Sequence, residues 1–215
     1  MLTSRKTNLK TSGLYTDKVR NYSVPNSVDL ANKLLDEAGF PRKADGTRFE
    51  IVHDITPYGE EWQRFGEAVQ QQLAQVGIKS TLRYEDVATW LKRTYTDYDF
   101  YITSNFLYNL ADPVLGVHRS FHSALIKQGT VFVNGSRWSS PETDDLMNKG
   151  SLEPDAKKRG ALYAELQKLT VEAAPIAWMI ELHFPTVMNK SYKDVIVSPL
   201  GSTAPTIARG GTSKR

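Results

Sequence analysis

The hydrophobic pattern alternates between two periods from residue 48 to residue 107, and this alternation most constrains the fold. Three short segments, residues 48–55, 79–84 and 99–107, have the composition of β-strands. The two segments between them place apolar side chains three and four residues apart, as on one face of a helix. Strands and helices that alternate with such short connections predict right-handed crossovers. The expected fold is α/β, a βαβαβ unit with a parallel or mixed sheet flanked by helices.

Apolar side chains mark the inner faces of both expected helices. They are Trp62, Phe65, Val69, Leu73 and Val76 on the first helix, and Val87, Trp90, Leu91 and Tyr95 on the second. Gly77 ends the first helix and Asp86 caps the second. Because Trp62 and Trp90 lie on these faces, they favour core packing over an aromatic platform for a ligand.

Residues 27–39 predict an amphipathic helix that precedes this alternation. Ser27 can serve as its N-cap, and Gly39 provides the left-handed residue that ends it. The apolar side chains on one face are Leu30, Ala31, Leu34, Leu35 and Ala38. We expect this stripe to pack on the body of the domain.

The second half of the chain combines irregular and helical segments. Residues 108–139 have no lasting period and predict a long irregular connection. Ser140 caps the next helix, and residues 154–173 form another. Residues 176–182 and 185–188 are typical of late C-terminal strands.

These patterns divide the chain into three parts. Residues 1–27 are expected to form an irregular N-terminal arm, residues 28–200 an α/β domain, and residues 201–215 a loosely ordered tail. The net charge is +3, but residues 1–28 alone carry a surplus of four positive charges. The rest of the chain is therefore mildly acidic, which argues against a nucleic-acid partner. The absence of cysteine excludes disulfides, thiolate metal sites and thiol catalysis.

Two histidines supply the enzymatic alternative. His118 and His122 are spaced so that a helix would place both imidazoles on one face, but the glutamate of the zincin pattern is absent between them. Gly116 and its irregular surroundings disfavour a stable helix there, so loop histidines are the favoured interpretation and no metal or cofactor is expected. The sequence also lacks nucleophile-elbow, P-loop and dinucleotide motifs. The alternative is a small stand-alone α/β enzyme or regulatory domain that uses His118 or His122 with Asp112.

Residues 104–113, with the sequence SNFLYNLADP, form the favoured ligand-binding segment. The segment follows the third expected strand, and ligands of open α/β sheets gather at the carboxyl ends of parallel strands. Its candidate ligand-binding residues are Asn105, Phe106, Tyr108 and Asn109. Ordinary loop chemistry explains these four residues equally well.

Three motifs resemble consecutive landmarks of a known family. They are LLDEAGF at residues 34–40, WSSPETDDLM at residues 138–147, and the run from residue 155 to residue 175. In this order they resemble the family 5 solute-binding proteins, the extracytoplasmic receptors of bacterial peptide and nickel ABC importers. Three such motifs in order over about 145 residues are hard to obtain by accident. The resemblance implies a lobe of a type II periplasmic binding protein.

The resemblance also implies roles within the ligand-binding segment, which lines the cleft between the lobes in this family. Peptide-binding members resemble this chain in the pair Asp112–Pro113, so Asp112 joins the candidate residues. Several members carry an aspartate three residues earlier that holds the α-ammonium group of the peptide. Asn109 stands at that place here, which retains a hydrogen bond but loses the ion pair.

The resemblance further implies a binding function without enzymatic activity. We expect the C-terminal lobe of a periplasmic receptor that closes by hinge motion with an N-terminal lobe around a peptide-like solute and presents it to ABC permease subunits. Residues 1–15 have a basic start but lack the apolar region of a signal peptide. We therefore expect a fragment from which the N-terminal lobe and the signal peptide are missing.

Overall fold

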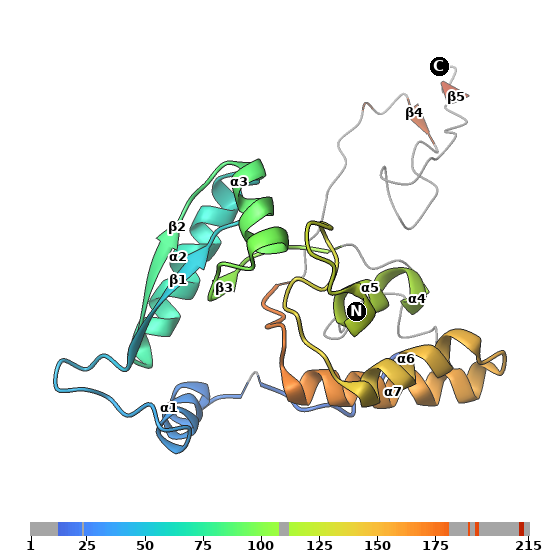
Figure 1. Cartoon of the computed structure of the whole chain (residues 1–215), viewed down its shortest axis with the longest axis horizontal. Helices are drawn as coiled ribbons and strands as arrows, with labels where there is room; N and C mark the ends of the chain where they lie inside the picture. The colour runs from blue at the N-terminus through green and yellow to red at the C-terminus, as the bar shows by residue number, and fades with distance from the viewer. Residues whose placement is uncertain are drawn as a thin grey trace. The chain divides into compact units, whose positions relative to one another are not determined.

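The computed structural model describes residues 13–22, 24–107, 112–180, 189, 192–193 and 211–212 (Figure 1). The chain divides into two compact units, residues 1–177 and residues 178–215. Within the described residues, the helices and the parallel sheet belong to the first unit. In the part of the chain that the structure describes, no helix is both long and apolar enough to cross a membrane.

A three-stranded parallel sheet forms the centre of the first unit. β1 (Phe49–Asp54) lies between β2 (Ile78–Arg83) and β3 (Ile102–Thr103). β1 and β2 pair over their whole length, so that Asp54 lies opposite Arg83. Since β1 also pairs in parallel with β3, the strand order is β2-β1-β3.

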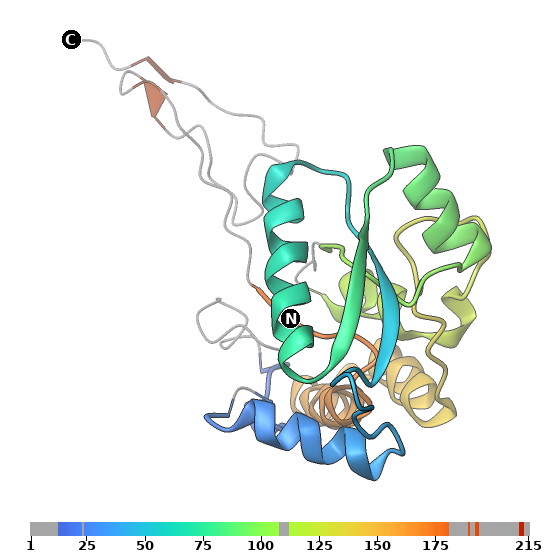
Figure 2. The ribbon, with the colours of Figure 1, turned by 90° about the vertical axis from the view of Figure 1, so that its left-hand side faces the viewer.

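Two helical connections link these strands. α2 (Glu60–Gln75) joins β1 to β2 and lies along one face of the sheet (Figure 2). α3 (Val87–Lys92), followed by a π-helical turn, η2 (Arg93–Asp97), leads from β2 to β3. The predicted α/β fold, with helices flanking a parallel βαβαβ sheet, is confirmed.

The start of α3 and the burial of two tryptophans follow the sequence prediction, but Val87, which was predicted on the inner face of α3, is 42% exposed. Asp86 caps α3, since its carboxylate accepts hydrogen bonds from the backbone N–H groups of Ala88 and Thr89 at 2.9 and 3.1 Å. Trp62 and Trp90 are both buried, which confirms that they pack in the core.

β3 is much shorter than the strand predicted at residues 99–107. Tyr98 adopts a left-handed conformation with φ of 53° just before this segment. After β3, the backbone N–H of Ser104 still donates to the carbonyl of Asp54 at 3.0 Å, but the carbonyl of Ser104 accepts from the hydroxyl of Thr56. A side chain thus replaces the backbone partner, and the ladder ends.

α1 (Ser27–Glu37) is the amphipathic helix that the sequence predicts, with two differences. Its N-cap is Asn26, because the carbonyl of Asn26 already accepts the N–H of Leu30 at 3.0 Å, so the assignment of Ser27 was wrong by one residue. The apolar stripe is not packed as expected, since no residue of α1 is buried and Leu34 is 44% exposed.

Arg48 attaches α1 to the sheet. Its buried guanidinium donates to the carbonyl of Val76 at 2.9 Å and to the side-chain oxygen of Asn32 at 3.0 Å. The same group forms an ion pair with Asp36 at 2.5 Å and also donates to the carbonyl of Phe40. One side chain therefore satisfies acceptors from α1, from Phe40 after α1 and from Val76, two residues before β2.

The connection predicted as irregular contains three short helical turns. They are α4 (Pro113–Gly116), α5 (His118–Phe121) and the 3₁₀ turn η3 (Ser123–Leu125). The expectation that no helix forms around His118 was therefore wrong for residues 118–121. The carboxylate of Asp112 accepts a hydrogen bond from the N–H of Val114 at 2.9 Å and so caps the start of α4. Such a cap is a local signal and does not produce a long hydrophobic period in the sequence.

Two longer helices lie side by side in the second half of the unit (Figure 1). α6 (Pro141–Leu152) begins after Ser140, whose hydroxyl accepts from the N–H of Thr143 at 3.4 Å, as the sequence predicts. α7 (Ala156–Ala173) is capped by Asp155. Residues 13–22 contain no helix or strand and lie along α7, where the carbonyl of Thr16 accepts from Gln167 at 2.6 Å.

The late strands differ from the prediction. Residues 176–180 are not in a strand, because the described residues of the sheet pair only in the order β2-β1-β3 and offer this run no partner. Residues 181–182 of the first predicted strand, and the strand predicted at residues 185–188, lie outside the described residues. In the second unit, β4 (Tyr192–Lys193) pairs antiparallel with β5 (Gly211–Thr212).

His118 connects α5 to α7. Its Nε2 lies 3.0 Å from the hydroxyl of Tyr163, and the residue is only 8% exposed. Burial, together with the positive charge that His122 can carry, lowers the pKa of His118 to about 4. The folded protein therefore favours the neutral imidazole, although Asp112 acts in the opposite direction.

Replacing Arg48 by methionine should weaken the attachment of α1. The change removes hydrogen bonds from a charged donor, each worth about 1.5–3 kcal/mol, and leaves the Val76 carbonyl without this partner. We expect the free energy of unfolding to fall by about 3 kcal/mol, measured by urea denaturation. The control is Arg64→Met, whose ion pair with Glu60 is exposed and should contribute less than about 0.5 kcal/mol. Equal losses in the two variants would contradict the role of Arg48.

The stability of the fold should depend on the protonation of His118. The folded-state pKa lies below the usual 6.5, so the stabilising effect is complete above pH 6.5 and is lost as the pH falls toward about 4. Between pH 7 and pH 5, we expect the free energy of unfolding to fall by on the order of 2 kcal/mol less in His118→Gln than in the unchanged protein. The measurement is the free energy of unfolding of both proteins at each pH. Parallel curves for the two proteins would show that His118 does not titrate in this way.

Candidate functional site

A buried carboxylate organises the carboxyl edge of the sheet. Asp54, the last residue of β1, is 1% exposed. Both of its oxygens accept hydrogen bonds from Arg83, from Nε at 2.6 Å and from Nη2 at 2.9 Å. This bidentate pair raises the pKa of Arg83, chiefly through the hydrogen bond to Asp54. The parallel register, which places the two residues opposite each other, brings them together.

Arg93 of η2 extends the network of charges. Its Nε and Nη2 donate to the two oxygens of Glu85 at 2.9 and 2.8 Å, and its Nε lies 3.7 Å from Asp54. It also forms an ion pair with Asp99. The hydrogen bond from Arg93 holds the pKa of Glu85 below its usual value. Three carboxylates thus surround two guanidinium groups, which leaves one net negative charge at this edge.

His53 and Ser104 form a second buried contact between β1 and the residue after β3. His53 Nε2 lies 2.6 Å from Ser104 Oγ, and burial lowers the pKa of His53 against the opposing effect of Asp54. Within the described residues, His53 Nδ1 has no hydrogen-bond partner. The pair resembles a nucleophile with its base, but both side chains are buried and the adjacent carboxylate, Asp54, is bound to Arg83. The contact fastens the edge strand to the sheet.

An aromatic cluster lies beside these polar groups. Phe106 stacks on Trp62 with ring centroids 5.6 Å apart, and Tyr58 meets the rings of Phe106 and Trp90 edge-on at 5.9 Å. The indole N–H of Trp90 donates to the hydroxyl of Thr103 at 3.0 Å. The cluster therefore gives the segment after β3 a rigid apolar support.

The structure places two of the predicted site residues at this edge. Asn105 donates from its amide nitrogen to the hydroxyl of Tyr95 at 2.8 Å and accepts the backbone N–H of Phe106 at 2.8 Å. Phe106 lies in the aromatic cluster. Tyr108 and Asn109 lie outside the described residues.

Asp112, the fifth predicted site residue, is held by α7. Both of its oxygens accept hydrogen bonds from Arg159 Nη2, at 2.8 and 2.9 Å, and this pairing lowers the pKa of the carboxyl. The structure therefore brings together Asn105 and Phe106, while Asp112 fixes the far end of the segment to another helix.

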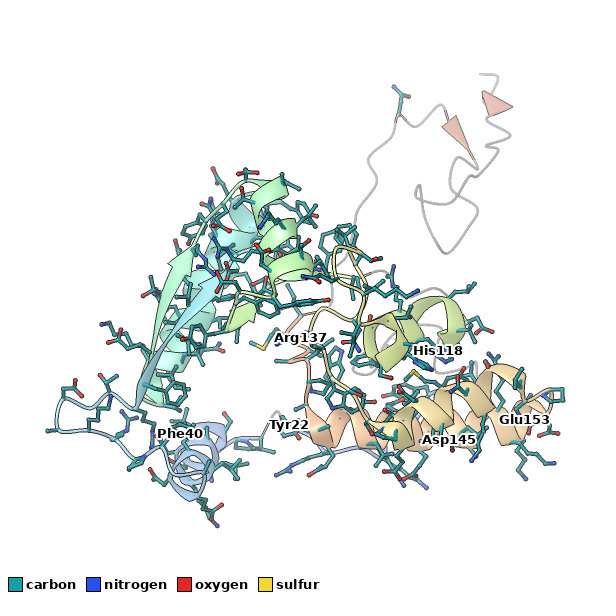
Figure 3. All side chains as sticks on the ribbon, viewed as in Figure 1. Tyr22, Phe40, His118, Arg137, Asp145 and Glu153 are labelled. Atoms are coloured by element: carbon teal, nitrogen blue, oxygen red, sulfur yellow. The ribbon has the colours of Figure 1, made fainter. Side chains whose placement is uncertain are left out.

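His118 and His122 do not form a metal site with the residues that the structure describes. Their ring centroids are 6.5 Å apart, and His118 points toward the helix pair α6 and α7 (Figure 3). His122 Nε2 lies 3.2 Å from the side-chain oxygen of Asn148, and its Nδ1 accepts the N–H of Ala124 at 3.1 Å. Among the described residues, no group of three or more His, Cys, Asp or Glu side chains could hold a metal ion.

A pocket of about 160 Å³ opens beside this network. It lies between the loop after β1, the start of α2 and the residues after β2. Its walls consist of residues 55–57, Gly59, Gln63, Tyr84 and Glu85. The sequence predicts a ligand site only in the segment after β3 and not at this pocket, although the same rule about carboxyl ends of strands applies to β1 and β2.

Comparisons with curated proteins find peptide-binding relatives. The chain is 25% identical over 187 residues to the dipeptide-binding protein of Escherichia coli (strain K12), covering 87% of this chain and 34% of the relative. It is also 25% identical over 182 residues to di/tripeptide-binding protein 2 of Pseudomonas aeruginosa (strain UCBPP-PA14), covering 84% of this chain and 32% of the relative. The chain thus spans about a third of the length of these relatives.

Two solved structures share the fold of this chain. HbpA2 from Haemophilus parasuis matches with a TM-score of 0.63 and 23% identity, covering 75% of this chain and 31% of that protein. The oligopeptide-binding protein AppA from Bacillus subtilis, solved with a nonapeptide, matches with a TM-score of 0.62 and 21% identity, covering 75% of this chain and 32% of that protein.

The match to a family model covers more than half of the chain and spans the sheet, its connecting helices and the predicted ligand-binding segment. The model describes the bacterial extracellular solute-binding proteins, family 5 Middle, and it matches residues 5–127. This chain belongs to the family 5 bacterial extracellular solute-binding proteins.

Proposed function

We propose that this chain is the C-terminal lobe of a periplasmic substrate-binding protein that serves an ABC importer. It binds a peptide-like solute in a cleft between lobes and closes by hinge motion with an N-terminal lobe, then delivers the solute to the permease subunits. The family and the peptide-binding relatives support this proposal. The relative from Escherichia coli is about two and a half times as long as this chain, which leaves room for a second lobe.

The observation that carries the proposal is the convergence of polar and aromatic groups at the carboxyl edge of the sheet. Asn105, Phe106 and the pocket of about 160 Å³ all belong to this edge. Ligands of open α/β sheets bind there. A binding site without covalent chemistry requires only such a rigid, partly apolar surface with a few oriented polar groups.

Within this site, Asn105, Phe106, Tyr108 and Asn109 contact the solute, and the segment that follows Ser104 pairs with an extended peptide backbone. Asp112 belongs to the site as the residue that fixes its end, since Arg159 holds its carboxylate at 2.8 and 2.9 Å. An amide at position 109 favours ligands without a free α-ammonium group over those that need an ion pair.

The enzymatic alternative has weaker support. It requires His118 or His122 to act with Asp112, but Asp112 is bound to Arg159 and His118 is buried against Tyr163. A catalytic base must reach its substrate. The protein therefore functions as a receptor and not as an enzyme.

Peptide affinity should depend on both lobes. Because the solute is enclosed between them, the 215-residue chain alone buries only part of its surface. We expect isothermal titration calorimetry with a mixed di- and tripeptide library to show binding at least about 100-fold weaker for the chain alone than for the longest natural protein that contains it. Equally tight binding by the chain alone would refute enclosure between lobes.

Asn109→Asp should increase the affinity for peptides with a free amino terminus. The new carboxylate supplies an ion pair of about 1–2 kcal/mol to the α-ammonium group, which corresponds to roughly a 5- to 30-fold gain. Calorimetry on the same full-length protein measures the gain, with N-acetylated forms of the same peptides as the control. A similar gain for acetylated peptides, or none for either set, would show that position 109 does not face the amino terminus.

A further inference from the structure

The pocket beside the charge network is large enough for a side chain of the solute. Its volume is about 160 Å³. An engineered protein cavity of about 150 Å³ holds a benzene ring, so this pocket accommodates a group of about six non-hydrogen atoms. Its rim is accessible, because Gly59 and Gln63 are exposed and Tyr84 is 48% exposed.

The walls of the pocket offer groups that attract a cation. Glu85 supplies a carboxylate whose side chain is 16% exposed, and Gln63 supplies a further polar side chain. Tyr84 adds an aromatic ring, which can interact favourably with an ammonium or guanidinium group. No lysine or arginine is among the residues that line the pocket.

The charged groups around the pocket also favour a cationic ligand. Arg83 and Arg93 are engaged with Asp54, Glu85 and Asp99, so this network retains one net negative charge. The first turn of α2 adds two further carboxylates, Glu60 and Glu61, of which Glu60 is paired with Arg64 at 3.2 Å. The net negative charge around the pocket is larger than the half positive charge at the N-terminus of α2.

We propose that this pocket accepts the cationic side chain of a lysine or arginine residue of the bound peptide. The inference rests on the proposed function, since it assigns a side-chain preference to the same ligand site. The aliphatic part of the side chain lies along Pro57, and the charged end lies near Glu85 and the ring of Tyr84. The carboxyl edge of β1 and β2 thereby selects the ligand, while the segment after β3 holds its backbone.

The test compares two charge substitutions on one helix. Gln63→Lys places a positive charge at the pocket wall, and Gln72→Lys places the same charge nine residues later, on the opposite face of α2. Both glutamines are exposed, so both variants should fold. Calorimetry uses the longest natural protein that contains this chain, with tripeptides of alanine that carry lysine, glutamine or glutamate at each position in turn.

We expect one lysine position to bind about tenfold more tightly than its glutamine counterpart, and Gln63→Lys to abolish this ratio. Gln72→Lys should leave the ratio unchanged. Equal affinity for lysine and glutamine peptides at every position, or equal effects of the two substitutions, would overturn the assignment of the pocket while leaving peptide binding intact. Failure of every peptide to bind would overturn the proposed function together with it.

Discussion

The neutralisation of Asp54 is the interaction on which the carboxyl edge of the sheet depends. A carboxylate that is 1% exposed is stable only when it is paired and hydrogen-bonded. Arg83 supplies two hydrogen bonds to it, and Arg93 adds a second positive charge 3.7 Å away. The three residues belong to β1, β2 and η2. The need to balance the charge of Asp54 therefore fixes the ends of β1 and β2 and the turn before β3 relative to one another.

The same arrangement determines which charged group faces the pocket. Arg93 donates to both oxygens of Glu85 and also pairs with Asp99, and Glu85, held in this way, forms a wall of the pocket. Glu85 remains ionised because Arg93 lowers the pKa of its carboxyl. The polarity of the pocket is therefore a consequence of how the buried charge on the sheet is balanced, and not of a separate group of residues.

Much of the fold could be predicted from the sequence because its signals are local. The periodicity of residues 48–107, the cap at Asp86 and the start of α6 at Ser140 each involve neighbours within a few residues. The length of β3 could not be predicted, since it depends on a hydrogen bond from Thr56 to Ser104. For the same reason the sequence identified Asn105 and Phe106 but not the pocket, whose walls are brought together only by the register of β1 and β2.

The contact between His53 and Ser104 shows why short distances alone do not indicate catalysis. A serine 2.6 Å from an imidazole has the geometry of a nucleophile and its base, and burial keeps His53 neutral, as a base must be. Yet both side chains are buried and no carboxylate orients the ring within the described residues, because Asp54 points to Arg83 on the other side of the strand. A substrate could reach Ser104 only if the edge strand separated from the sheet. The pair therefore stabilises the surface on which the solute is held, and rigidity at this place is what a receptor needs.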